Sequence, residues 1–202
     1  MTNSATFRDL RSSIGRLGRN YLSFKSRPIG NYTPRQFSCT AAYTIFCHAE
    51  IETFLEEWAT KLTDLADTNW QSRQACRPLV HLCTFHEGRG IPSDVPNKDI
   101  WNMVIFDSIA KHRRTIKQNN GIKENNIIKL LSPLGFDVRT IDSIFLADIS
   151  SFGKDRGDLA HNSMRMHIGN VFDPFGVKRK VEMLLLQLSV LDNQITSYYD
   201  SC

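Results

Sequence analysis

TPRQFSCTAAYTIFCHAEIETFLEEWATKLTDLAD, residues 33–67, is the stretch that determines the fold. It opens with a capping box, in which Thr33 is the N-cap, Pro34 takes the first helical position and Gln36 reaches back to the N-cap. Apolar residues then recur at helical spacing, at Phe37, Ala41, Ile45, Ala49, Phe54, Leu55, Trp58, Leu62 and Leu65. The pattern predicts one long α-helix that runs through about residue 67.

An amphipathic helix is predicted before this one. Its apolar residues recur at alternating gaps of three and four, at Phe7, Leu10, Ile14, Leu17, Tyr21 and Phe24. Gly15 and Gly18 lower the intrinsic helix propensity of the segment, so packing must hold it. Pro28 and Gly30 mark the loop that ends it.

Two more helical segments are predicted in the middle of the chain. One covers about 70–86 and must bend or restart near Pro78, because proline cannot continue the helical hydrogen bonding. A loop over 87–98, rich in glycine and proline, separates it from the next helix. That helix starts near residue 100 and ends at Asn119-Asn120-Gly121, a typical C-terminal stop.

The C-terminal part of the chain also shows helical periodicity. A short helix over 124–132 stops at Pro133, another covers about 141–152, and Asp173-Pro174 caps the last one. The last helix has a strong apolar stripe, at Val181, Leu184, Leu185, Leu188, Leu191 and Ile195. No segment shows the alternation of a β-strand. The predicted fold class is therefore all-α, a helical bundle of about five to seven helices.

Length and composition point to a cytoplasmic globular protein. The 202 residues suffice for one well-buried domain but not for two, so residues 1–202 are predicted to form a single domain. No apolar run is long enough to span a bilayer, and the N-terminus lacks the apolar segment of a signal peptide, so no membrane partner is expected. Five scattered cysteines, an odd number, fit reduced thiols. The formal charge of +4 permits an RNA partner without requiring one.

The segment with the most chemical content is RGDLAHN, residues 156–162, just past the helix over 141–152. The Arg156 guanidinium is always charged and can fork onto phosphate oxygens. The His161 imidazole, with an ordinary pKa of about 6.5, can take a proton from a hydroxyl and return one to a leaving group. Together they can cleave RNA without a metal, using the RNA 2′-hydroxyl as the nucleophile.

The spacing of this pair leaves an alternative open. Residues five apart on a regular helix point roughly 140° away from each other. Arg156 and His161 therefore converge only if the segment is irregular, as Gly153 and Gly157 would allow, or if two copies meet across a symmetry axis. The structural alternative is a surface arginine paired with Asp155 or with Asp158, beside a histidine that packs or caps.

The residues around the pair resemble the HEPN superfamily (higher eukaryotes and prokaryotes nucleotide-binding domain), and most of all its RiboL-PSP-HEPN branch. In that branch the motif typically reads Arg-Asn-x-Ile-Ala-His-Gly, where this chain has Arg156-Gly157-Asp158-Leu159-Ala160-His161-Asn162. AEIETFLE, residues 49–56, is similar to the family's small-x-x-Glu-x-Phe-Leu helix and places its acidic residue at Glu52. Ile29-Gly30-Asn31-Tyr32, between two predicted helices, is a third point of similarity.

The resemblance implies a metal-independent endoribonuclease of bacterial defence or toxin–antitoxin systems, which needs no cofactor. Arg156 would bind the scissile phosphate and His161 would transfer protons. Family members generally act as homodimers whose two motifs line a shared cleft, and an antitoxin or defence-system protein is a further partner to expect. Gly157 stands where the family has a polar residue, for which Asp158 or Asn162 would substitute. This departure keeps open a second interpretation, a non-catalytic HEPN module that binds RNA, a nucleotide or a protein.

Other charged residues are candidates for supporting roles. Glu52 lies on a helix with apolar faces, so a bundle-facing carboxylate there would need a partner such as Arg156; the alternative is a solvated glutamate. Two basic runs are candidate RNA contacts. The first contains Lys111, Arg113 and Arg114, with Lys117 and Lys123 after it; the second contains Lys178, Arg179 and Lys180. For the first run the simpler explanation is a solvated helix C-terminus, where the helix dipole attracts cations. The second run lies at a helix start, where the dipole disfavours cations, and a solvated turn is the simpler explanation there.

A zinc site is the last alternative. Cys76, Cys83 and His86 can share a helix face, but His81 points elsewhere and no Cys-x-x-Cys pair is present. Core packing explains buried cysteines more simply, so no metal ligand is predicted. A helical hydrolase with zinc around Cys83 and His86 stays as a third functional possibility.

Overall fold

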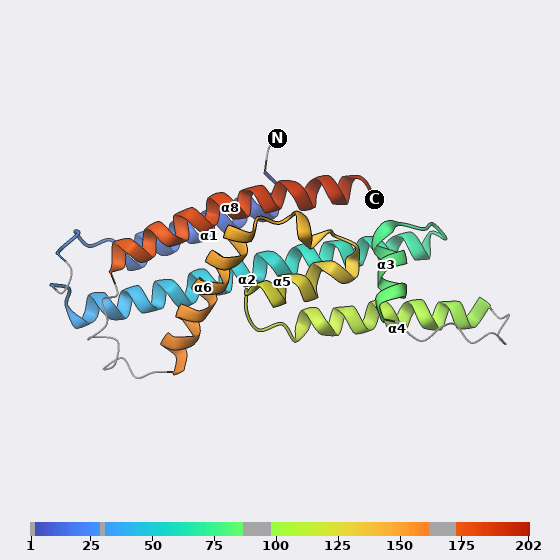
Figure 1. Cartoon of the computed structure of the whole chain (residues 1–202), viewed down its shortest axis with the longest axis horizontal. Helices are drawn as coiled ribbons and strands as arrows, with labels where there is room; N and C mark the ends of the chain where they lie inside the picture. The colour runs from blue at the N-terminus through green and yellow to red at the C-terminus, as the bar shows by residue number, and fades with distance from the viewer. Residues whose placement is uncertain (1–2, 29–30, 87–97, 162–172) are drawn as a thin grey trace.

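The computed structural model describes residues 3–28, 31–86, 98–161 and 173–202, and for residues 98–100 and 160–161 it describes the backbone alone. Seven α-helices and two 3₁₀ turns make up this part of the chain (Figure 1). They are α1 (Ala5–Tyr21), α2 (Pro34–Gln71), α3 (Arg77–His86), α4 (Lys98–Lys117), α5 (Glu124–Leu131), η1 (Ser132–Leu134), η2 (Val138–Thr140), α6 (Ser143–His161) and α8 (Pro174–Asp200). No described residue is in a strand. The all-α prediction is confirmed.

Local signals start the two longest helices where the sequence predicts. The Thr33 side chain accepts a hydrogen bond from the Gln36 backbone, and the Thr33 backbone N–H donates to Gln36 Oε1 at 2.9 Å, which completes the capping box of α2. The Asp173 carboxylate caps α8 in the same way, because it accepts from the backbone N–H groups of Phe175 and Gly176. These bonds satisfy amides that no earlier helical turn can reach.

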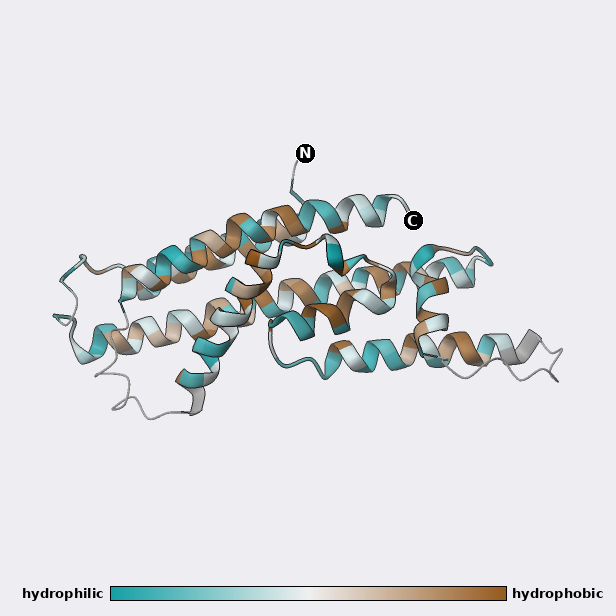
Figure 2. Cartoon of the chain, in the orientation of Figure 1, coloured by the Kyte–Doolittle hydropathy of each residue, from teal (hydrophilic) through white to brown (hydrophobic). Residues whose placement is uncertain are grey.

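The 38-residue helix α2 is the centre of the bundle. Helices α1, α3, α4, α5, α6 and α8 all pack against it, and α1 and α8 also contact each other (Figure 1). Its buried face contains Cys47, Ile51, Leu55 and Leu62, each fully shielded from solvent. Hydrophobic and hydrophilic residues alternate along the long helices, as amphipathic helices require (Figure 2). Burial of these apolar faces is the main stabilising contribution.

A buried carboxylate joins three of the helices. Asp192 of α8 is fully buried and accepts hydrogen bonds from the Trp58 indole of α2 at 2.9 Å, and from the backbone and hydroxyl of Ser4 at 2.8 and 2.6 Å. Ser4 is itself the N-cap of α1, since its side chain accepts from the Phe7 backbone. The start of α1 is therefore tied to α8 through one buried carboxyl group.

Several helix boundaries differ from the predictions. Helix α1 ends at Tyr21, so Phe24 lies beyond it, and α2 continues four residues past Asp67 to Gln71. A turn then separates α2 from α3, where Pro78 lies in the first helical turn, as the predicted restart requires. Most of the predicted loop over 87–98 lies outside the described residues. Helix α4 already begins at Lys98.

Candidate functional site

The segment 156–161 forms the last turns of helix α6. The backbone is helical through His161, so the expectation that the segment follows a helix is wrong. Gly157 does not interrupt the helix, and a Cβ placed there would meet no atom within 4 Å. Arg156 is half-buried and Asp158 is exposed. In a continuous helix the positions of Arg156 and His161 lie on different faces, about 140° apart.

The two ends of this motif are described to different extents. The His161 side chain and all of Asn162 lie outside the described part of the structure. The described part of the site is therefore its Arg156 side, where α6 meets α2 and α8.

Helix α6 is fixed to α8 next to the motif. Lys180 of α8 forms an ion pair with Asp155 at 2.6 Å and donates a hydrogen bond to the Ser151 hydroxyl at 3.0 Å. About two turns before Asp155 on α6, Asp148 accepts a hydrogen bond from Gln187 of α8 at 2.9 Å. Asp155 directly precedes Arg156, so these contacts restrict the rotation and position of the turn that carries the arginine.

Glu52 faces the bundle and has partners that the sequence did not indicate. Its side chain is 17% exposed. Its Oε1 atom accepts hydrogen bonds from the backbone N–H of Gly121 and, at 3.4 Å, from the Asn119 amide. The same Asn119 amide donates to Glu56 at 2.9 Å, and its oxygen accepts from Asn126 at 2.9 Å. These hydrogen bonds hold the loop between α4 and α5 against the middle of α2.

The predicted Glu52–Arg156 pair exists as a longer-range attraction and not as a direct ion pair within the described residues. Burial raises the pKa of Glu52, while the Gly121 N–H and the Arg156 charge oppose that rise. The Arg156 charge also acts on His48 of α2, whose pKa falls to about 4 because of burial first and Arg156 second. Arg156 thus lies close enough to α2 to influence two of its titratable groups.

His48 belongs to this site although sequence analysis did not select it. The imidazole is 2% exposed, and its Nδ1 lies 3.8 Å from Glu52 Oε2. A pKa of about 4 makes it neutral at pH 7. The available signal was its position four residues before Glu52, a spacing that brings two side chains onto one helix face.

The candidate RNA contacts on α4 differ in whether their charges are already paired with carboxylates. Arg113 makes ion pairs with Asp64 and Asp67 of α2, both at 2.8 Å. Lys111 pairs with Asp107 at 2.6 Å. Arg114 is exposed, and no ion pair to it occurs within the described residues. Of the three, Arg114 has the charge that is most available to a phosphate.

The second basic run lies at the start of α8. Lys178 is 3.9 Å from Glu182, and Arg179 is 4.0 Å from Asp173, so both pairs are at the limit of an ion pair. Both cations are partly or largely exposed. Loose, exposed pairs of this kind contribute little to stability, so these cations can turn to another anion at little cost.

The residues considered for zinc do not form a ligand set in the described ranges. No group of three or more His, Cys, Asp or Glu side chains in those ranges could hold a metal ion. His86 instead packs beside His112 of α4, with ring centroids 5.8 Å apart. His112 is fully buried, and its Nε2 donates to the Leu130 carbonyl at 3.2 Å. Burial lowers the pKa of His112 to about 4, with a further contribution from His86.

The sequence of this helical bundle matches a known protein family. The family model described as RiboL-PSP-HEPN matches residues 19–195, which include α2, α6 and most of α8. The chain belongs to the RiboL-PSP-HEPN family. Glu52, Arg156 and His161 all lie inside the matched region of this RiboL-PSP-HEPN domain. No match was found among curated proteins or among solved structures. No helix in the described part of this RiboL-PSP-HEPN chain is long and apolar enough to cross a membrane.

Proposed function

We propose that this RiboL-PSP-HEPN chain is a metal-independent endoribonuclease that acts in the cytoplasm as part of a bacterial defence or toxin–antitoxin system. Residues 1–202 form one catalytic domain. RNA is the substrate, and an antitoxin or another protein of the defence system restrains the activity. The observation that carries this proposal is the family match over residues 19–195, which includes the Arg156 and His161 motif.

In the proposed reaction the RNA supplies its own nucleophile. The 2′-hydroxyl oxygen attacks the adjacent phosphorus and loses its proton, while the bond from phosphorus to the 5′-oxygen breaks and that oxygen gains a proton. His161 takes part in this proton transfer. Arg156 binds the phosphate and stabilises the charge that builds in the transition state. The products are a 2′,3′-cyclic phosphate and a free 5′-hydroxyl.

A homodimer supplies what one motif lacks. Two positions about 140° apart on one helix cannot both face the same phosphate, whereas a two-fold axis can place Arg156 of one subunit opposite His161 of the other. In each subunit, the contacts of α6 with α8 keep the turn that carries Arg156 in place. Asp158 or Asn162 acts in place of the polar residue that is absent at Gly157.

The test is cleavage of total RNA by purified protein in excess EDTA. We expect the native protein to cleave, and His161→Ala and Arg156→Lys each to lose at least about 100-fold in rate. A lysine ammonium cannot reproduce the bidentate hold of a guanidinium on phosphate. Lys154→Ala is the matched control, because it removes an exposed charge from the same helix.

Two outcomes would contradict this mechanism: cleavage that disappears in EDTA, or cleavage that survives in folded His161→Ala protein. A native protein that cleaves no RNA but binds it would support the second candidate, a non-catalytic HEPN module. The observation behind that candidate is Gly157, which places no side chain beside Arg156.

A further inference from the structure

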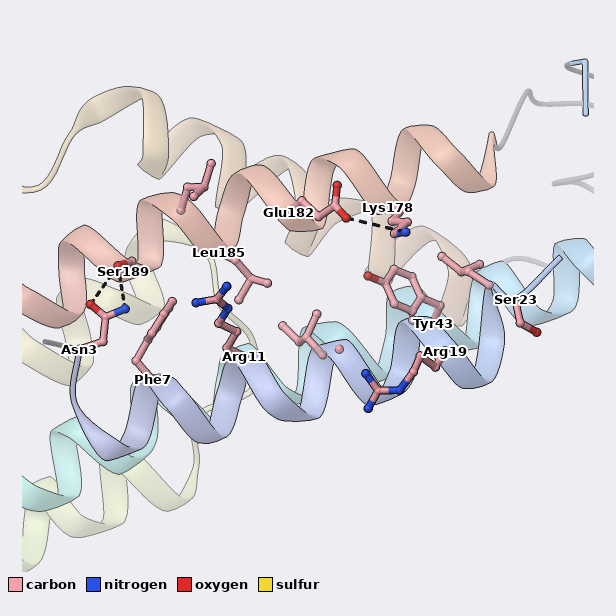
Figure 3. A pocket seen from close by; sticks show the side chains of 15 residues that line it. Asn3, Phe7, Arg11, Arg19, Ser23, Tyr43, Lys178, Glu182, Leu185 and Ser189 are labelled. Carbon is pink, nitrogen blue, oxygen red and sulfur yellow. Dashed lines mark hydrogen bonds and ion pairs between the residues drawn. The ribbon is translucent and has the colours of Figure 1, made fainter. Parts of the chain in front are cut away.

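A cavity of about 850 Å³ lies between α1 and the N-terminal part of α8 (Figure 3). Its apolar wall contains Phe7 and Ile14 of α1, Leu22 just after α1, and Leu185 of α8, and Tyr43 of α2 lies between the two helices. This volume falls in the range of cavities that hold small molecules. None of these residues belongs to the site built around Arg156.

Two glycines keep this cavity open. Gly15 and Gly18 line it from the interior of α1, where glycine weakens a helix relative to alanine. Neither has a positive φ, and a Cβ added at Gly15 or Gly18 would approach other side chains no closer than 3.7 or 4.0 Å. Backbone conformation and helix packing therefore do not require glycine at either position. What a side chain there would change is the free space of the cavity.

The rim of the cavity is basic. Arg11 and Arg19 of α1 and Lys178 of α8 line it, opposed by one acidic residue, Glu182. The Arg11 guanidinium extends toward Leu185, across the opening between the helices (Figure 3). Within the described residues, neither Arg11 nor Arg19 has an ion-pair partner, and the Lys178–Glu182 pair is 3.9 Å long. The net positive charge is thus available to an anion.

The cationic rim continues past the end of this cavity. A second hollow of about 640 Å³ shares Lys178 and Glu182 with it and adds Arg27, Arg179 and the acidic Asp173, so cations outnumber carboxylates there by three to two. An apolar interior with cations at its mouth fits a molecule that has an apolar body and an anionic group.

We propose that the cavity between α1 and α8 binds a small amphipathic anion, whose apolar body lies against Phe7, Ile14 and Leu185 and whose phosphate, sulfonate or carboxylate group is held by Arg11, Arg19 and Lys178. The binding is independent of RNA cleavage at Arg156 and His161. Both an acyl chain with a phosphate head and a flat ring system with a phosphate have this chemistry, so the probes must distinguish them.

Calorimetric titration of the full chain tests this site with three organic probes: anilinonaphthalene sulfonate, dodecyl phosphate and adenosine monophosphate. Inorganic phosphate is the fourth probe and lacks an apolar body. We expect at least one organic probe to bind at least 10-fold more tightly than inorganic phosphate. Which of them binds identifies the apolar body as a chain or a ring system.

Variants locate the binding. Gly15→Leu fills the cavity and should weaken the best probe at least 10-fold while raising the melting temperature, because leucine favours helix. Arg11→Gln should weaken the same probe without filling space, and it keeps the test valid if Gly15→Leu folds poorly. Ser12→Leu and Arg16→Gln are the matched controls, since both change exposed residues of α1 that do not line the cavity.

Three results would overturn the assignment. One is the absence of binding by every organic probe, and another is equal binding of inorganic phosphate. The third is a probe that binds Gly15→Leu and Arg11→Gln as tightly as it binds the native protein, which would place it elsewhere on the surface.

Discussion

His48 and His112 are imidazoles enclosed in the helical core, and burial lowers the pKa of each to about 4. Both are therefore neutral at pH 7 in the folded protein. In the unfolded chain they titrate with a pKa of about 6.5, so acid protonates the unfolded form first. Their contribution to stability is complete above pH 6.5 and is lost as the pH falls toward 4.

We expect the free energy of unfolding to fall by about 2 kcal/mol for each of these histidines between pH 7 and pH 5. Urea denaturation at the two pH values measures the change. In each of the variants His48→Gln and His112→Gln, the loss of stability between pH 7 and pH 5 should be smaller by about 2 kcal/mol than in the native protein, because glutamine does not titrate. In the control His81→Gln, an exposed imidazole of α3 is removed, and the pH dependence should stay as in the native protein. An unchanged pH dependence in both core variants would show that other groups cause it.

At the scale of helices, Asp192 decides how α1, α2 and α8 meet. Its carboxylate is fully buried and accepts three hydrogen bonds, from the Trp58 indole and from the backbone and hydroxyl of Ser4. Asp192→Ala leaves these donors unsatisfied, so we expect it to destabilise the protein by about 3 kcal/mol or more. Thermal and urea denaturation measure this. Asp200→Ala, an exposed carboxylate at the end of α8, should change stability by less than about 0.5 kcal/mol. Equal effects of the two substitutions would contradict the anchoring role.

The basic face of α4 gives a second prediction at this scale. Arg113 is held by two aspartates of α2, whereas Arg114 is exposed and has no ion pair within the described residues. If α4 contacts RNA phosphates, Arg114→Gln should reduce the salt dependence of RNA binding by about one unit of slope. Arg113→Gln should reduce it less, because Asp64 and Asp67 already neutralise that charge. RNA binding measured over a series of salt concentrations checks this. Identical slopes for both variants and the native protein would show that these α4 cations are solvated and do not contact RNA.

At the scale of the whole molecule, the proposed dimer must use the surface that α6 leaves free. Phe145, Ile149 and Phe152 of α6 are buried in the chain's own core, so the apolar stripe of this helix is already used. Ile144 is 65% exposed on α6. On α8, which packs against α6, an exposed apolar stripe consists of Met183, Leu186 and Val190. These four are the large exposed apolar residues of α6 and α8 within the described ranges, and we expect a second subunit to contact them. Leu186 also lines the cavity between α1 and α8, so a ligand there would lie beside this interface.

We expect light scattering to give twice the 23.1 kDa mass of the chain, and Ile144→Asp to shift the protein toward the monomer and reduce RNA cleavage in parallel. Val80→Asp is the control, since it places the same charge at an exposed apolar position of α3. A native protein that is monomeric at high concentration and fully active would contradict the shared-cleft mechanism.

Much of the fold was predictable because its signals are local. The capping box at Thr33, the N-cap at Asp173 and the apolar periodicity of α2 and α8 each depend on residues within a few positions of one another. The helix boundaries depend on packing as well as on local signals, as α6 shows. Its glycines suggested an interruption, yet packing against α2 and α8 keeps the helix continuous through His161.

The sequence by itself determined the all-α class, the central helix and the family motif, since helical periodicity, caps and short motifs are written in neighbouring residues. Only the tertiary structure decided the surroundings of that motif. Glu52 is held by the backbone of Gly121, 69 positions away, and His48 joins the site because α6 brings the Arg156 charge to α2. The cavity beside Gly15 and Gly18 also exists only where α1 meets α8. Such partners follow from how helices pack around a shared core, a geometry that local patterns do not specify.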